Sequence, residues 1–175
     1  NGIALSSTDY WFVLELTNGK TIGGHFALKG IMSVEDAKKA LDIGCTGIMV
    51  SNHGGRQLDG ALSSIRVLPE ILDTVGDKIE VHLDSGIRSG QDVLKALALG
   101  ATGTYIGRAY IYGLGALGQL GVETALSIIQ KELDTTMALC GEKNIHSLSP
   151  NLFFTPPTCP KRLVTRVTLR FLGKW

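Results

Sequence analysis

The chain has few cysteines, few aromatic residues and no excess of charge, and each shortage excludes a class of protein. Its three cysteines, Cys45, Cys140 and Cys159, are widely spaced and odd in number. This argues against a disulfide framework or a zinc site and fits a reducing compartment. Aromatic residues make up 6% and the formal net charge is +1, so the whole chain gives no nucleic-acid-binding footprint. Without an apolar run long enough to cross a bilayer, or a signal peptide, we expect a cytoplasmic protein.

What is present is typical of a globular α/β protein with two unusual ends. Hydrophobic residues make up 44% of the 175 residues, enough for one domain with a core. Residues 149–175 form a basic, proline-containing tail without acidic residues, which we expect to be poorly ordered. Its basic residues are Lys161, Arg162, Arg166, Arg170 and Lys174. Residues 1–25 carry no assignable motif, so the predicted domain covers residues 26–148.

Between these ends, short apolar runs alternate with helical patterns. We expect four strands, at residues 25–28, 46–50, 79–83 and 103–106, each followed by a helix. Ser33 is suited to cap the first helix, and residues 113–121 are expected to connect to the last helix, which runs through residues 122–137. Four strand–helix units at regular spacing imply a parallel sheet with right-handed crossovers.

Two architectures share this rhythm, a doubly wound sheet and half of a (β/α)8 barrel. The residues that follow the strands favour the barrel, because its loops converge over one mouth. Lys29 follows the first strand, and the last two loops place glycine beside arginine, at Gly86 with Arg88 and at Gly107 with Arg108. Barrels often bind phosphate with the loops after strands seven and eight. We therefore predict an α/β fold of the TIM-barrel type, with about the last four βα units present.

The loop after the second predicted strand carries the strongest chemical signal, Ser51-Asn52-His53-Gly54-Gly55-Arg56-Gln57. A histidine takes up a proton near neutral pH, and an arginine can grip a carboxylate with two parallel hydrogen bonds. The two glycines permit close approach of a ligand to the backbone. This combination suggests removal of a proton from a small acid anchored by its carboxylate, although Arg56 could instead form a surface ion pair with Asp59.

These motifs together resemble the FMN-dependent α-hydroxy-acid dehydrogenases and oxidases, a family that includes L-lactate dehydrogenase, glycolate oxidase and mandelate dehydrogenase. The segment from Ser51 to Gln57 matches the family's active-site signature in full, and the resemblance runs from about residue 27 to residue 148. The run Asp84-Ser85-Gly86-Ile87-Arg88 is more similar to bacterial L-lactate dehydrogenases than to glycolate oxidases, which usually have glycine in place of Ser85.

The resemblance implies a role for each motif residue. His53 would be the catalytic base and would contact the substrate, Arg56 would bind the substrate carboxylate, and Lys29 would lie beside the flavin N1 and C2 carbonyl. FMN would be the cofactor, and no metal is implied. The implied cofactor-binding residues are Lys29, Ser51, Asp84, Ser85, Gly86, Ile87, Arg88, Gly107 and Arg108.

The resemblance also implies a substrate and an electron acceptor, and it leaves alternative functions open. The substrate would be a small 2-hydroxy carboxylate, most simply L-lactate, oxidised to the 2-oxo acid, with a quinone, a cytochrome or oxygen as electron acceptor. The full-length family suggests a homo-oligomer, and peripheral association with the inner face of the cell membrane is open. Because the first half of the barrel is not visible, we expect a fragment with weak or no activity. The alternatives are a non-catalytic half-barrel that binds a phosphate-containing ligand or a partner, and a different phosphate-binding barrel enzyme.

Overall fold

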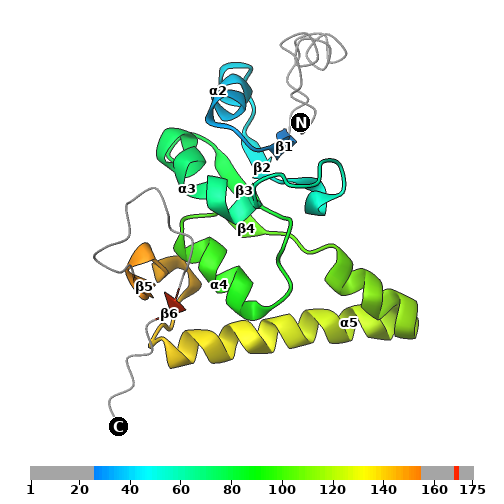
Figure 1. The fold of residues 1–175 in the computed structure, drawn as a ribbon. Helices are drawn as coiled ribbons and strands as arrows, with labels where there is room; N and C mark the ends of the chain where they lie inside the picture. The colour runs from blue at the N-terminus through cyan, green and yellow to red at the C-terminus, as the bar shows by residue number, and fades with distance from the viewer. Residues whose placement is uncertain (1–25, 155–167, 170–175) are drawn as a thin grey trace. The chain divides into compact units, whose positions relative to one another are not determined.

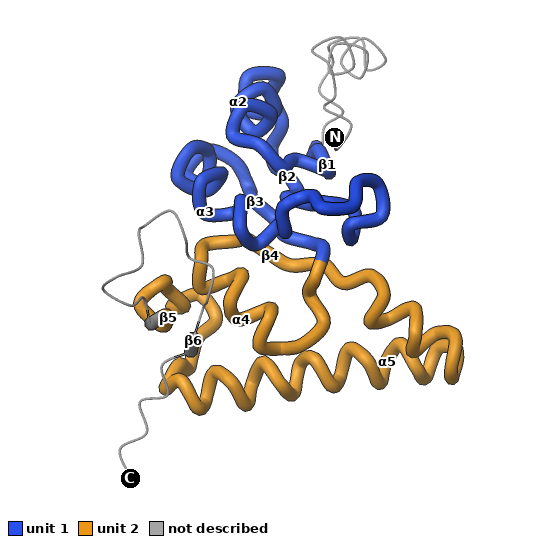
Figure 2. The backbone as a smooth tube through the Cα atoms, in the orientation of Figure 1, with its two compact units in different colours: residues 1–85 blue, residues 86–175 orange. Residues whose placement is uncertain are grey.

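The structure, a computed structural model, describes residues 26–154 and 168–169 (Figure 1). The predicted N-terminal segment, residues 1–25, and most of the basic tail lie outside the described residues. The chain divides into two compact units, residues 1–85 and residues 86–175 (Figure 2). Each unit is described by itself below.

The first unit contains three strands, and helical segments follow the first two of them. The elements in chain order are β1 (Ala27–Ile31), α2 (Val34–Asp42), β2 (Gly47–Val50), the short 3-10 helix η1 (His53–Gly55), α3 (Ser64–Val75) and β3 (Glu80–Leu83). Strand β2 pairs with β1 on one side and β3 on the other, and both pairings are parallel. The predicted alternation and the parallel sheet are therefore confirmed in this unit.

The register of the sheet separates an apolar face from a more polar one. Leu28, Ile48 and Val81 are aligned across the three strands and are buried, while α2 packs against β1 and α3 against β2 and β3. The neighbouring residues Lys29, Met49 and His82 are aligned in the same way. Since successive side chains of a strand point to opposite faces, the second set lies on the face away from the apolar one.

Strand β1 is longer than the sequence predicts. We expected it to end before Lys29, but it continues to Ile31, and the register shifts between Lys29 and Ile31. Gly30, at φ +97°, provides the backbone conformation that this bulge needs and that other residues adopt only with strain. As a result, Lys29 lies within β1, two residues before the carboxyl end of the strand.

The helix starts follow the expected chemistry. The Ser33 hydroxyl accepts a hydrogen bond of 3.1 Å from the backbone N–H of Asp36, which caps α2 as predicted. In the second unit, Ser89 caps α4 (Gly90–Ala98) in the same way through Asp92. Each serine satisfies one of the backbone N–H groups that a helix leaves unpaired at its start.

The second unit is dominated by helix α5 (Arg108–Leu139), which follows the short strand β4 (Gly103–Thr104). Residues 113–121, expected to be a connection, are instead part of α5, which is broken only at Leu117 and Gly118. The prediction was wrong because glycines usually weaken helices. Here Gly113 and Gly121 allow two backbone segments to touch where any Cβ atom would collide.

The remaining described elements are short. Two 3-10 helices, η2 (Ile145–Ser147) and η3 (Pro150–Leu152), lead to β5 (Phe153–Phe154), which pairs antiparallel with β6 (Thr168–Leu169). Within the described part of the chain, no helix is both long and apolar enough to cross a membrane.

Candidate functional site

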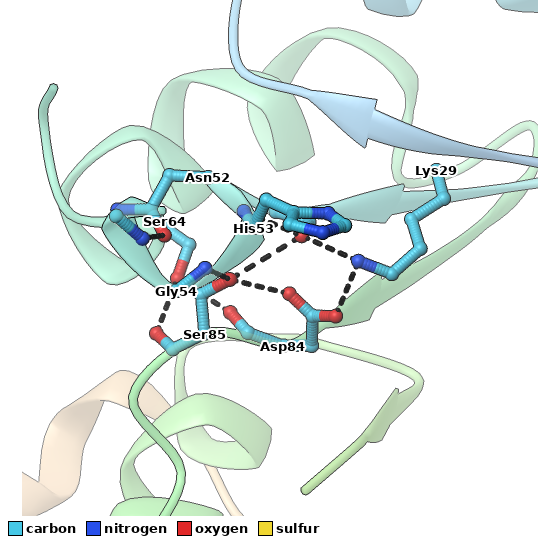
Figure 3. A network of polar contacts seen from close by, with 9 residues as sticks. Lys29, Asn52, His53, Gly54, Ser64, Asp84 and Ser85 are labelled. Atoms are coloured by element: carbon cyan, nitrogen blue, oxygen red, sulfur yellow. Dashed lines mark hydrogen bonds and ion pairs between the residues drawn. The ribbon is translucent and has the colours of Figure 1, made fainter. Parts of the chain in front are cut away.

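A network of polar side chains lies at the carboxyl ends of the three strands of the first unit (Figure 3). The Lys29 Nζ lies 2.7 Å from Asp84 Oδ2 and donates a 2.8 Å hydrogen bond to Ser51 Oγ. Ser51 directly follows β2, and Asp84 directly follows β3. The parallel sheet therefore brings together residues that are up to 55 positions apart in the sequence, at the edge where ligands bind in α/β folds.

Two serine hydroxyls complete the network. Ser85 Oγ donates a 2.5 Å hydrogen bond to Asp84 Oδ1 and lies 3.3 Å from Ser51 Oγ. Lys29, Ser51, Ser85 and Asp84 thus form a closed ring of hydrogen bonds.

The network keeps Asp84 ionised. Burial alone would raise the pKa of the Asp84 carboxyl, but hydrogen bonds from Lys29, Ser51 and Ser85, together with the positive charge of Lys29, outweigh burial and hold this pKa below its ordinary value of 3.8. The Asp84 side chain is 18% exposed and that of Lys29 is 47% exposed. The lysine ammonium is therefore anchored by the carboxylate but still reachable from solvent.

The signature loop turns sharply immediately after β2. His53, Gly54 and Gly55 all have positive φ, at 57°, 68° and 72°. This conformation directs two successive N–H groups into the network: His53 N–H donates to Ser51 Oγ at 3.1 Å, and Gly54 N–H donates to Ser85 Oγ at 3.0 Å. A non-glycine residue with positive φ is strained, and such strain clusters at functional sites. The turn fixes the point where the His53 side chain leaves the backbone.

Two residues that sequence reasoning did not single out hold this arrangement in place. Asn52 accepts a hydrogen bond from Gly55 N–H and donates another to the Leu62 carbonyl, both 3.1 Å long. Ser64, which is fully buried, places its hydroxyl 2.6 Å from the Asp84 carbonyl and 2.9 Å from the Ser85 carbonyl. The only sequence signal for Ser64 is its place at the start of a predicted helix.

The side chains of His53 and Arg56 are exposed and make no hydrogen bond or ion pair with other described residues. Arg56 follows η1 as its C-terminal cap. The Asp59 carboxylate accepts a hydrogen bond from the neighbouring N–H of Gly60, so within residues 26–154 the ion pair considered for Arg56 with Asp59 is not formed. Both functional groups are available to a ligand.

The other predicted cofactor residues belong to the second unit. Gly86 has φ +114°, Ile87 is buried, and Arg88 is exposed, with its backbone N–H bonded to Asp92 Oδ2 at 3.1 Å. Gly107 precedes α5, and Arg108 is its first residue. Gly107 and Arg108 therefore lie at a helix N-terminus, where backbone N–H groups favour anions.

Comparison with known proteins identifies a family and several relatives of this chain. The profile of the family described as FMN-dependent dehydrogenase matches residues 13–155, a wider stretch than the expected 27–148. The chain is 53% identical over 129 residues to an L-lactate dehydrogenase of Caulobacter vibrioides, covering 74% of this chain and 34% of the relative. It is 52% identical over 134 residues to a pre-mycofactocin synthase of Mycobacterium tuberculosis, covering 77% of this chain and 34% of the relative.

Solved structures resemble the fold as well. A soluble mutant of the membrane-associated (S)-mandelate dehydrogenase of Pseudomonas putida has a TM-score of 0.76 and 39% identity, covering 84% of this chain and 40% of that one. A mandelate oxidase mutant with an FMN adduct has a TM-score of 0.73 and 44% identity, covering 79% of this chain and 44% of that one.

Two predictions are confirmed by these matches, the α/β fold of the barrel type and FMN as the cofactor. The chain spans about a third of the length of the curated relatives it matches. The signature loop, the lysine–aspartate pair and the extent of the family match together lead to one conclusion: this chain belongs to the FMN-dependent dehydrogenase family.

Proposed function

We propose that this chain supplies the base, the carboxylate anchor and part of the flavin site for oxidation of an L-2-hydroxy acid, most simply L-lactate, to the 2-oxo acid. The observation that carries the proposal is the ion pair of Lys29 with Asp84, joined by hydrogen bonds to the turn that bears His53. A cation for the flavin and a base for the substrate are thus linked at one edge of the sheet.

His53 is the proposed base. Its backbone is held by Ser51 and Asn52, while its imidazole is exposed and has no partner among the described residues. A neutral imidazole nitrogen can accept a proton from a substrate that it contacts. It would accept either the α-proton or the hydroxyl proton of the substrate. In both routes the substrate loses two protons and two electrons: His53 would take one proton, and bound FMN would supply the acceptor for the electron pair and the second proton.

Arg56 is the proposed anchor for the substrate carboxylate. It comes three residues after His53, where the chain leaves the 3-10 turn, and its guanidinium forms no ion pair within the described part of the chain. A guanidinium presents paired N–H groups that match both oxygens of a carboxylate. Binding the acid by this end would hold its C2 atom near the histidine.

Lys29 fits the flavin in charge and in hydrogen-bonding capacity. Its ammonium has three N–H groups; among the described residues, Ser51 and Asp84 take two of them. The third is available to an acceptor on the flavin, such as the C2 carbonyl. FMN supplies the two-electron acceptor when bound, and a fixed cation beside N1 stabilises the negative charge of its reduced form. Ser51 and Asp84 would hold the lysine in that place.

The second unit is proposed to bind the FMN ribityl chain and phosphate. Gly107 and Arg108 lie at the start of α5, and a glycine there leaves the backbone open to an anion. The backbone of Gly86 is also open, because a Cβ built on it meets nothing within 4 Å. Ile87 is buried and anchors the loop between Gly86 and Arg88, while the exposed Arg88 can neutralise phosphate.

The test begins with binding and continues with reduction. The purified chain is titrated with FMN, and flavin absorbance is followed under anaerobic conditions after addition of L-lactate, (S)-mandelate or glycolate. We expect saturable FMN binding, slow bleaching that is fastest with L-lactate, and loss of bleaching in His53→Gln. In Arg56→Lys, we expect a higher lactate concentration for half-maximal bleaching. A chain that binds no FMN, or bleaching unchanged by His53→Gln, would contradict the proposal.

The electron acceptor and the location of the chain need one further experiment each. We propose that the reduced flavin passes its electrons to a quinone, a cytochrome or oxygen, and adding each acceptor in turn to the bleached sample identifies which one restores the oxidised spectrum. The proposed location is the cytoplasm, with contact to the inner face of the membrane, because one solved relative is described as a monotopic membrane protein. Sedimentation of the chain with vesicles distinguishes the two.

A further inference from the structure

Ser85 occupies a backbone conformation that is unfavourable for it. Its φ is +70°, and among the described residues only one other non-glycine, His53, has a positive φ. An L-residue keeps this conformation only where its surroundings enforce it. The two strained residues lie in successive strand-end loops of the first unit, and the network described above connects them.

The backbone around Ser85 is held by the fully buried Ser64. The Ser64 hydroxyl lies within hydrogen-bonding distance of the carbonyls of both Asp84 and Ser85, at 2.6 and 2.9 Å. Ser64 is the first residue of α3, which packs against β3. The contact therefore ties the start of α3 to the exit of β3, directly at the strained residue.

The side chain of Ser85 joins the two loops. Its hydroxyl accepts the N–H of Gly54 at 3.0 Å, donates to Asp84 Oδ1 at 2.5 Å and lies 3.3 Å from the Ser51 hydroxyl. A hydroxyl has one hydrogen and two lone pairs. The one hydrogen goes to Asp84 and one lone pair accepts the Gly54 N–H, so the Ser85 hydroxyl has no hydrogen left to donate to the flavin.

We propose that Ser85 is a positioning residue, whose hydroxyl fixes the His53–Gly54 turn relative to the Lys29–Asp84 pair. This inference rests on the proposed function, which makes His53 the base and Lys29 the cation that faces the flavin. Ser85 would hold these two groups at a constant spacing. It differs from the role that the family resemblance implies, which is direct contact with the cofactor.

Two substitutions separate the hydroxyl from the strain. Ser85→Gly removes the hydroxyl and relieves the positive φ, while Ser85→Ala removes the hydroxyl and keeps the strain. Ser63→Ala is a matched control, because Ser63 caps α3 without a side-chain hydrogen bond. In the full chain without flavin, NMR gives the exchange rate of the Gly54 amide hydrogen, the ring resonances of His53 and the pKa of Asp84.

We expect the same change in both Ser85 variants. The Gly54 amide should exchange about five- to tenfold faster, as expected for loss of one hydrogen bond of ordinary strength. The His53 resonances should shift and the pKa of Asp84 should rise, while Ser63→Ala matches the wild type. Ser85→Gly should show these NMR changes and still melt at a higher temperature than Ser85→Ala, because glycine relieves the strain. If Ser85 only stabilised the fold, the NMR changes would be smaller in the more stable variant. Unchanged Gly54 exchange in both variants, or a change in Ser85→Ala alone, would overturn the proposal.

FMN affinity gives the second readout. If Ser85 positions other residues, both variants should bind FMN within about twofold of the wild type. A tenfold loss of FMN affinity with unchanged Gly54 exchange would instead make Ser85 a cofactor contact. A wild-type chain that binds no FMN would contradict the proposed function, and the NMR result would still decide the role of Ser85.

Discussion

Asp84→Asn tests whether the charge of Asp84, rather than its shape, holds the strand-end network together. The substitution keeps the size of the side chain but removes its negative charge. The Lys29–Asp84 contact is 2.7 Å long, and at an effective dielectric constant of 20 Coulomb's law gives an upper bound of about 6 kcal/mol for such a pair. Since nearly half of the Lys29 side chain is exposed, screening reduces the net contribution to about 1 kcal/mol.

The pH dependence of this effect gives the sharper test. The pKa of Asp84 is lowered in the folded chain, so the unfolded chain takes up the proton first as the pH falls. The stability that the charge provides is therefore present above about pH 4 and is lost as the pH falls through the folded-state pKa. We expect Asp84→Asn to unfold at lower urea concentration than the wild type at pH 7, and this difference to shrink as the pH falls below about 4.

Urea unfolding of both proteins from pH 2.5 to 7 measures this difference. Asp36→Asn is a matched control, because Asp36 forms an ion pair with Lys39 at 3.5 Å. The Asp36 side chain is 18% exposed and that of Lys39 is 49% exposed, which closely matches the Asp84–Lys29 pair. Its expected effect is about 0.5 kcal/mol, as for an ordinary surface pair on a helix. A difference between wild type and Asp84→Asn that stays constant across the pH range would refute the electrostatic account.

Three further predictions concern the packing around the site. Ser64→Ala should destabilise the chain by about 2 kcal/mol, because it removes a buried hydroxyl bonded to two carbonyls; a loss below about 0.5 kcal/mol in urea unfolding would show that the contact is dispensable. Gly90→Ala should cost about 3 kcal/mol, since a Cβ there would collide with the backbone of Leu133 and lie 2.5 Å from the Ile129 carbonyl; a melting temperature equal to that of the wild type would contradict this packing. Burial raises the pKa of the Cys45 thiol to about 11, so iodoacetamide at pH 8 should leave Cys45 unmodified until urea unfolds the chain; modification of Cys45 in the native protein, seen by peptide mass spectrometry, would show that it is accessible.

The sequence predicts those parts of the fold and site that depend on neighbouring residues. The apolar runs indicate the three strands of the first unit, and Ser33 with Asp36 predicts the start of α2. The signature around His53 directly follows a strand, as its sequence suggests. Each of these features is encoded within a few residues, where the period of apolar residues and the chemistry of caps apply.

The parts that could not be predicted depend on contacts between distant residues. The contact of Ser64 with the Asp84 carbonyl joins positions 20 residues apart, and nothing near Ser64 in the sequence indicates it. The positive φ of Ser85 is equally hidden in the sequence, because serine rarely adopts this conformation unless its surroundings enforce it. Glycines at 113 and 121 suggested a connecting loop, because local propensity disfavours them in helices. Only the close approach of two backbone segments explains why they are helical.

The central claim is that the network around Lys29 is the flavin end of the site, and FMN affinity tests it most directly. Lys29→Met removes the cation, and Lys39→Met is the control, since Lys39 is equally exposed and lies in α2 away from the network. Titration of flavin fluorescence with each purified chain should show binding by the wild type and by Lys39→Met. We expect Lys29→Met to bind FMN at least about tenfold more weakly, as loss of a charged hydrogen bond predicts. Equal FMN affinity in Lys29→Met and the wild type would contradict the claim.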